Sequence, residues 1–192
     1  MQFKLEIDAF MTQTQKQSHY PDPTNKQEVV VRTLSILVDN EPGVLARVIG
    51  LFSARGYNID SLTVTETEHE KHLSRITIMT RGTPAVIEQI KHQLERMVPV
   101  HRVADLTSVG DSLERELALI KVAGKGEKRI ESLRLAEIYG ASVIDASTEH
   151  FVFEVTGPSP EIERFIKIMT ELGLVEVSRT GIAAMARGAA GM

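Results

Sequence analysis

Two short polar runs hold the residues whose types and spacing favour ligand chemistry. The first is Asn40-Glu41-Pro42-Gly43, which separates an apolar run from an amphipathic one, and the second begins at Asn58. Proline suits the first position of a helix, and glycine leaves the backbone open to close approach, so we expect a helix that begins at Pro42. Its N-terminus favours an anion, and Asn40 can either cap the helix or face the ligand.

The chemistry of this corner fits one class of ligand, a free α-amino acid. Its carboxylate would accept hydrogen bonds from amides near Gly43, and its ammonium would meet the side-chain oxygens of Asn40 and Asn58. We expect both asparagines to converge on one small pocket, with Leu45 and Ile59 against the side chain of the ligand. A well-capped helix start without any ligand is the alternative interpretation of the same turn.

The hydrophobic pattern places these residues in a module of order β-α-β-β-α-β. Alternating apolar residues predict strands, and apolar residues at i, i+3, i+4 and i+7 predict helices. This order builds a four-stranded antiparallel sheet with two helices on one side, the ferredoxin-like arrangement. We expect helices over 42–55 and 84–97, and strands over 30–38, 58–66, 73–80 and 98–106.

The same order repeats in the second half of the chain, so we expect an α+β protein of two ferredoxin-like βαββαβ modules in tandem. The apolar residues Ile130, Leu133, Ala136 and Ile138 predict one helix of the second module. The effector-type turn is present once, because the second module has Gly124 and Lys125 at the corresponding place. The expected division is a mobile extension at 1–28, modules at 29–106 and 113–180, a linker at 107–112 and a tail at 181–192.

Composition excludes several classes of protein. The chain has 192 residues, a net charge of −4 and no cysteine. The lack of cysteine excludes disulfides, thiolate zinc sites and a cysteine nucleophile, and the acidic balance gives no field that attracts nucleic acid. No apolar run reaches the roughly 18 residues of a membrane helix, and the first residues do not form a signal peptide. We expect a cytoplasmic protein that binds neither nucleic acid nor membrane.

Other polar groups are weaker candidates. His69 and His72 lie on an expected hairpin tip, where solvent-exposed side chains are a plainer interpretation than a metal site. The run that contains Lys125 lacks the spacing of a phosphate-binding loop, so a solvated helix start is the plainer interpretation there. The charged residues at 114–116 are interpreted as exposed side chains of a strand rather than as a surface that binds a partner. The segment 179–187 fits docking on another subunit as well as a frayed terminus. Because no spacing indicates a nucleophile with its base or a metal shell, we expect no catalytic centre.

A family resemblance rests on the two polar runs. The stretch from residue 32 to residue 48 resembles the small-ligand regulatory module called the ACT domain. The continuation, Gly50 to Val64, is similar to the regulatory small subunit of acetolactate synthase, also called acetohydroxyacid synthase. The resemblance covers about 30–188 and resumes at Leu73-Ser74-Arg75-Ile76-Thr77, at Glu114-Arg115-Glu116-Leu117 and at Ser178-Arg179-Thr180-Gly181-Ile182.

The resemblance implies a regulatory subunit with no catalytic centre and no cofactor of its own. Members of this family bind a large catalytic subunit that joins two pyruvates into 2-acetolactate and CO2, raise its activity and make it sensitive to valine. Thiamine diphosphate, magnesium and FAD are expected on that large subunit. The effector lies where two ACT modules pair edge to edge, which implies a homodimer or higher oligomer. The effector contacts carried over are Asn40, Gly43, Val44, Leu45, Asn58 and Ile59.

Two alternatives stay open at this point, and a third lacks support in the sequence. The chain can be a stand-alone ACT-type amino acid sensor that acts on another metabolic enzyme. A free-standing enzyme would form acetolactate without a large subunit. An amino-acid-responsive transcription factor would need a helix-turn-helix and a basic face, for which the acidic balance and the assigned helices leave no room. The sequence does not distinguish valine, leucine and isoleucine as the effector, because one methylene changes the binding free energy by only about 1–3 kcal/mol.

Overall fold

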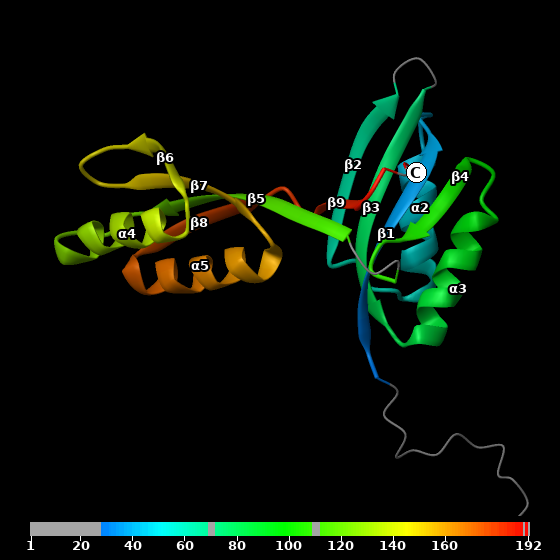
Figure 1. Ribbon diagram of the computed structural model, residues 1–192, viewed down its shortest axis with the longest axis horizontal. Helices are drawn as coiled ribbons and strands as arrows, with labels where there is room; N and C mark the ends of the chain where they lie inside the picture. The colour runs from blue at the N-terminus through cyan, green and yellow to red at the C-terminus, as the bar shows by residue number, and fades with distance from the viewer. Residues whose placement is uncertain (1–27, 69–71, 109–111, 190, 192) are drawn as a thin grey trace, which may run out of the picture.

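The computed structural model describes residues 28–68, 72–108, 112–189 and 191. In these ranges the chain forms two α+β units, each with its helices on one face of an antiparallel sheet (Figure 1). The expected extension at 1–28 lies outside the described residues except for residue 28, and His69 of the expected hairpin tip lies outside them too.

The first unit has the predicted order of elements. Among the described strands, β2 and β4 form the edges of its sheet, whose order is β2-β3-β1-β4 with every neighbouring pair antiparallel. The free backbone groups of β2 therefore face away from the unit. The elements are β1 (Val30–Asp39), α2 (Val44–Arg55), β2 (Ser61–Glu68), β3 (Leu73–Gly82), α3 (Pro84–Glu95) and β4 (Val100–Asp105).

Alternation along β1 separates the two faces of the first sheet. Leu34 and Ile36 lie in the apolar core with residues of both helices, such as Phe52 and Ile90. The intervening Ser35 lies on the opposite face, which carries no helix, yet its side chain is also buried. Residues 184–189 cover part of this helix-free face.

Helix α2 begins two residues later than the sequence predicted. Gly43 has a left-handed conformation, with φ of 85°, so the regular helix begins at Val44 and Pro42 lies in the preceding turn rather than at the first helical position. No described side chain caps this helix, so Asn40 is not its cap. The end of the helix agrees with the prediction, because Gly56 is left-handed and its N–H bonds back to the last turn.

The second unit confirms the predicted α+β class with two βαββαβ modules. The order of the described strands along its main sheet is β6-β7-β5-β8, with α4 and α5 on one face. Buried side chains of β5, β7 and α5, among them Ile120, Phe153 and Phe165, form its core. The elements are β5 (Ser112–Val122), α4 (Glu127–Ile138), β6 (Ser142–Ala146), β7 (Phe151–Gly157), α5 (Ser159–Leu172), β8 (Leu174–Arg179) and β9 (Ala183–Ala186).

Helix α4 is present as predicted, but of the four apolar residues that predict it only Ala136 is buried. Ser132 and Ala136 are its buried residues, whereas Ile138 is 76% exposed, and Ile130 and Leu133 are also exposed. The hydroxyl of Ser132 donates to the carbonyl of Arg129 at 2.8 Å, so burial leaves no hydroxyl unpaired. Small residues at 132 and 136 therefore let α4 approach its neighbours closely, and its larger apolar side chains face outward.

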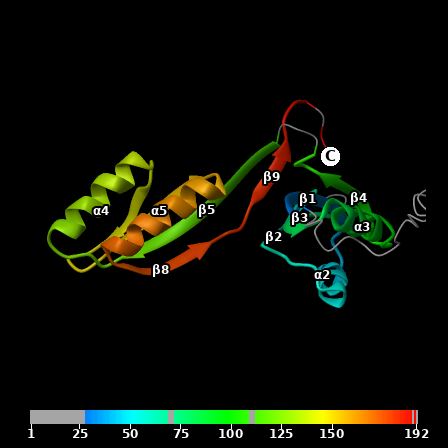
Figure 2. The same cartoon turned by 90° about the horizontal axis from the view of Figure 1, so that it is seen from below.

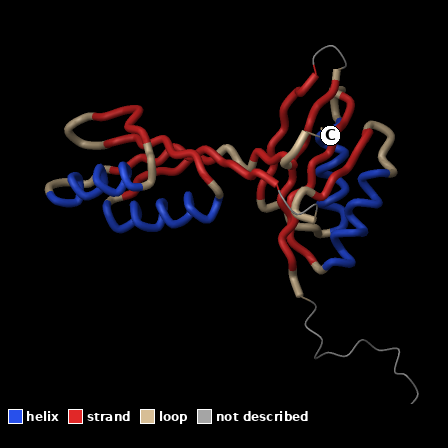
Figure 3. The backbone as a smooth tube through the Cα atoms, viewed as in Figure 1, coloured by secondary structure: helices blue, strands red, loops and turns tan. Residues whose placement is uncertain are grey.

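Strand β5 joins the two units. Its N-terminal part pairs with β9, and the rest pairs with β7 and β8. Figure 3 shows strands, in red, extending between the two units. The segment after β8 was expected to dock on another subunit or to fray, but residues 183–186 pair with β5 of the same chain. At the break between β8 and β9, Thr180 donates its N–H to the carbonyl of Leu117, and its hydroxyl accepts from the Leu117 N–H. Figure 2 shows β8 and β9 running along β5 toward the first unit.

Candidate functional site

The turn before α2 presents unused backbone donors. The N–H groups of Gly43, Leu45 and Ala46 have no hydrogen-bond partner among the described residues, whereas the N–H of Val44 donates to the carbonyl of Glu41 at 3.3 Å. A Cβ placed on Gly43 would meet no described atom within 4 Å. The turn is therefore open to a ligand, and its positive φ rather than crowding is what requires glycine.

Asn40 is exposed at the start of this turn, and its backbone is held in place. Its N–H donates to the carbonyl of His72 at 2.6 Å, which ties the turn to the beginning of β3. Two apolar residues of the predicted site differ in what they offer. The side chain of Val44 is in the core and only 2% exposed, so only its backbone faces the turn, whereas Leu45 is 37% exposed and offers its side chain.

Asn58 lies in a second polar group, beyond the other end of α2. The side-chain amide nitrogen of Asn58 donates to Asp60, and its backbone carbonyl accepts from the hydroxyl of Thr80 at 2.6 Å. Asp60 also accepts from the guanidinium of Arg81 at 2.7 Å. These bonds use the amide nitrogen of Asn58 and leave its side-chain oxygen for a cationic partner. The adjacent Ile59 is partly buried against the core.

The structure does not bring the two asparagines together within one chain. Asn40 and Gly43 precede α2, and Asn58 and Ile59 follow it, so the two sets are separated by a helix of 12 residues. Such a helix is about 18 Å long. The expectation that both asparagines converge on one pocket therefore fails for a single copy, because the two residues lie at opposite ends of this helix.

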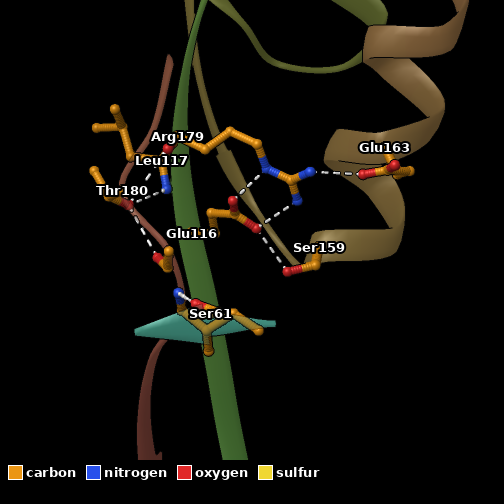
Figure 4. Close-up of polar contacts among 9 residues, drawn as sticks. Ser61, Glu116, Leu117, Ser159, Glu163, Arg179 and Thr180 are labelled. Carbon is orange, nitrogen blue, oxygen red and sulfur yellow. Dashed lines mark hydrogen bonds and ion pairs between the residues drawn. The ribbon is translucent and has the colours of Figure 1, made fainter. Parts of the chain in front are cut away.

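A charged cluster that sequence reasoning missed lies between the two units (Figure 4). Glu116 of β5 accepts hydrogen bonds from the guanidinium of Arg179, the nearer at 2.5 Å, and from the hydroxyl of Ser159 at 2.6 Å. Arg179 also donates to Glu163 of α5 at 2.7 Å. The prediction of exposed strand charges at 114–116 is wrong for Glu116, which is only 4% exposed. The pairing of 116 with 179 spans 63 positions, and no local pattern signals it.

The cluster forms one wall of a cavity of about 620 Å³ between the units. The opposite wall includes Asp60 and Arg81 from the first unit. Hydrogen bonds from Arg179 lower the pKa of the Glu116 carboxyl below its ordinary value, against the opposing effect of burial, and the same bonds raise the pKa of Arg179. Glu116 is therefore a carboxylate at neutral pH, held where the units meet.

Residues 180–189, called the C-terminal segment below, contact the first unit directly at this junction. The N–H of Ile182 donates to the hydroxyl of Ser61 at the start of β2, at 2.9 Å, and the side chain of Ile182 is buried. Gly181 lies so close to β2 that an added Cβ would approach the Ser61 hydroxyl to 2.8 Å. Because these contacts use a side chain of β2, they leave its backbone edge free.

Two further observations concern metal groups and helix length. No group of three or more histidine, aspartate or glutamate side chains gathers as a metal shell within the described ranges. The helices in those ranges are all too short or too polar to span a membrane.

Comparisons with known proteins place the chain in a family. Residues 34–102 match the family described as AHAS small subunit-like ACT domain, so the first unit defines an ACT-domain protein. Residues 115–188 match the family described as small subunit of acetolactate synthase. The chain belongs to the acetolactate synthase small subunits, a regulatory family, and the resemblance seen in the sequence is confirmed.

Individual relatives match most of the chain. A probable acetolactate synthase small subunit from Archaeoglobus fulgidus is 46% identical over 156 residues, which cover 81% of this chain and 96% of the relative. The small subunit of acetolactate synthase isozyme 3 from Escherichia coli is 42% identical, over 82% of this chain and 96% of the relative. The crystal structure of the small subunit from Thermotoga maritima is 40% identical, with a TM-score of 0.76, and covers 84% of this chain and 99% of that one.

Proposed function

We propose that this chain binds valine, or a related branched-chain amino acid, between two ACT modules and thereby regulates a large acetolactate synthase subunit. In this proposal the chain activates the large subunit and gives it feedback inhibition in branched-chain amino acid biosynthesis. The observation that carries the proposal is the placement of Asn40 and Asn58 at opposite ends of α2, in a unit whose β2 edge is free.

A symmetric dimer would join the two separated sets of residues into sites shared between the copies, one site per copy. If two copies pair through β2 about a two-fold axis perpendicular to the sheet, their α2 helices run antiparallel. The Asn40 end of one helix then faces the Asn58 end of the other. Val64 on β2 is 42% exposed, an apolar side chain that such pairing would cover. The contacts of Ser61 with the C-terminal segment involve its side chain and do not block the pairing.

The described groups match an amino acid zwitterion in this arrangement. The carboxylate would accept from the open amides at Gly43, Leu45 and Ala46, where the helix dipole adds about 0.3–2 kcal/mol. The ammonium would meet the side-chain oxygens of Asn40 and of Asn58 from a second copy. Charge-assisted hydrogen bonds contribute about 1.5–3 kcal/mol each, so two or three of them support micromolar to sub-millimolar affinity.

The apolar part of the ligand would contact two of the predicted residues. Leu45 is partly exposed beside the open turn, and Ile59 lies at the other end of the helix, next to Asn58. The side chain of Val44 is in the core, so we assign Val44 a role through its backbone alone. Valine, leucine and isoleucine differ here by about 1–3 kcal/mol at most per methylene.

The route from the effector to the large subunit passes through the junction between the units. A change in how the β2 edges pair would move Ser61, to which Ile182 is bonded, and Ile182 continues into β9 and thus to β5. We propose that the second module passes this movement to the large subunit, which carries thiamine diphosphate, magnesium and FAD in this scheme. The cytoplasmic location and the domain boundaries expected from the sequence stay predictions.

Calorimetric titration of valine, leucine and isoleucine into the purified chain, with and without a large subunit, tests this function. We expect one valine site per copy, and a holoenzyme that is more active than the large subunit alone and is inhibited by valine. A chain that binds none of the three amino acids, or that leaves the activity of the large subunit unchanged, would contradict the proposal.

A further inference from the structure

A cavity of about 470 Å³ lies between the helix-free face of the ACT sheet and the C-terminal segment. None of the residues proposed for the effector lines it. Its walls come from β1, β3 and β4 on one side and from β9 and the residues after it on the other. The cavity is therefore a separate candidate site within one copy of the chain.

Arginine side chains dominate the polar part of this cavity. Arg75 of β3 and Arg102 of β4 both pair in register with Leu37 of β1, so they lie in one row across three adjacent strands. Their Cα atoms are about 10 Å apart, because neighbouring strands are separated by about 4.8 Å. Arg187, which follows β9, lines the same cavity from the opposite side.

Arg75 and Arg102 have no acidic side chain beside them among the described residues of the lining. No aspartate or glutamate is among the described residues that line the cavity, and neither Arg75 nor Arg102 forms an ion pair with a described residue. The Nε of Arg75 is buried and has no hydrogen-bond partner among the described atoms. Because an unpaired buried donor on a charged group costs free energy, this arrangement favours an anion as the missing partner.

We propose that this cavity binds a phosphate dianion, either free phosphate or the phosphate of a small organic monoester. Guanidinium groups form two parallel hydrogen bonds to such oxyanions, and the two from Arg75 and Arg102 match a double negative charge. The cavity is larger than one phosphate needs, and Ala104, Leu106 and Met185 supply an apolar wall beyond the arginines. These dimensions favour a monoester with a compact apolar body.

Calorimetric titration of the full-length chain with inorganic phosphate and with phenyl phosphate tests the site. Ionic strength is held constant with sodium chloride. We expect phenyl phosphate to bind more tightly than inorganic phosphate, and we expect Arg75→Gln and Arg102→Gln each to weaken binding by about tenfold or more. The matched control is Arg164→Gln, an exposed arginine of α5 outside the cavity, which should bind as the parent does.

Thermal unfolding provides a second measurement that does not depend on the heat of binding. Phosphate should raise the melting temperature of the parent and of Arg164→Gln, and it should not raise that of the Arg75→Gln/Arg102→Gln double variant. Arg102 is exposed, so Arg102→Gln alone serves if the double variant does not fold. Equal affinity for the two probes would assign the site to free phosphate.

Three results would overturn the proposal. The first is the absence of binding of both probes to the parent at millimolar concentration. The second is unchanged binding in the arginine variants. The third is equal stabilisation by sodium chloride at the same ionic strength, which would indicate general screening rather than a site.

Discussion

Glu116 and Arg179 form a bidentate ion pair where the two units meet. The Nε and one terminal nitrogen of the guanidinium donate to the two carboxylate oxygens. The pair links the middle of β5 to the last residue of β8, next to the segment that contacts β2. Breaking it should therefore change both the stability of the chain and the connection between its units.

The first prediction concerns pH. The folded-state pKa of Glu116 is lowered from an ordinary value of 4.5, so the pair stabilises the fold fully above that value, and the stabilisation is lost as pH falls through the lower folded pKa. Glu116→Gln should lower the free energy of unfolding by about 1–3 kcal/mol at neutral pH. Below pH 4.5 the difference from the parent should shrink, as measured by urea unfolding across this range.

Glu163→Gln is the control for this prediction. Glu163 bonds to the same arginine, but its side chain is exposed, so its loss should change stability much less. Equal losses in Glu163→Gln and Glu116→Gln at neutral pH would show that the burial of Glu116 has no energetic effect.

The second prediction concerns the open turn. Gly43→Asp should place a carboxylate where the effector's carboxylate binds, and such a juxtaposition costs several kcal/mol. Valine inhibition of the holoenzyme should be lost while activation of the large subunit is retained. Gly43→Asn is the matched control, because asparagine has the same shape and tolerates the left-handed backbone found at this position. Equal valine inhibition in the two variants would show that the carboxylate of valine does not bind at this turn.

The third prediction tests whether the effector site is shared between two copies. Asn40→Ala and Asn58→Ala should each weaken valine binding by about 1–3 kcal/mol. A mixed dimer with one variant on each copy would contain one site that lacks both asparagines and one that keeps both. Calorimetry on the mixed dimer, purified through two different tags, should therefore recover half of the sites at parental affinity. No recovery would mean that each site lies within one copy.

The fourth prediction concerns communication between the units. Gly181→Ala would bring a Cβ to 2.8 Å from the Ser61 hydroxyl and to 3.0 Å from the Thr63 hydroxyl, and should displace the C-terminal segment from β2. Valine inhibition of the holoenzyme should weaken while valine affinity for the chain is kept. Gly188→Ala shares the positive φ but meets no described atom within 4 Å. Identical inhibition curves for the two variants would exclude this junction as the route.

Much of the fold could be predicted because it follows from local patterns. The apolar run along β1 and the glycine at 56 determine a strand and a helix end from neighbouring residues alone. The face of α4 could not be predicted in this way, because burial of Ser132 depends on a hydrogen bond and on close packing rather than on hydrophobicity. The family resemblance supplied the class of the protein directly.

The residues of the candidate site stay a prediction, whereas their placement in the fold differs from what the sequence predicted. Asn40 and Asn58 lie near element boundaries, which the pattern shows, but the length of α2 separates them within one copy. The pairing of Glu116 with Arg179 and the strand at 183–186 depend on contacts between distant parts of the chain. Such contacts leave no periodic signal in either segment.

A crystal structure of the chain grown with valine tests the central claim most directly. We predict a dimer paired through β2, with the carboxylate of valine at the amides after Gly43 and its ammonium within hydrogen-bond distance of Asn58 from the other copy. Valine bound at another place, or bound within a single copy while the β2 edges stay unpaired, would contradict the account.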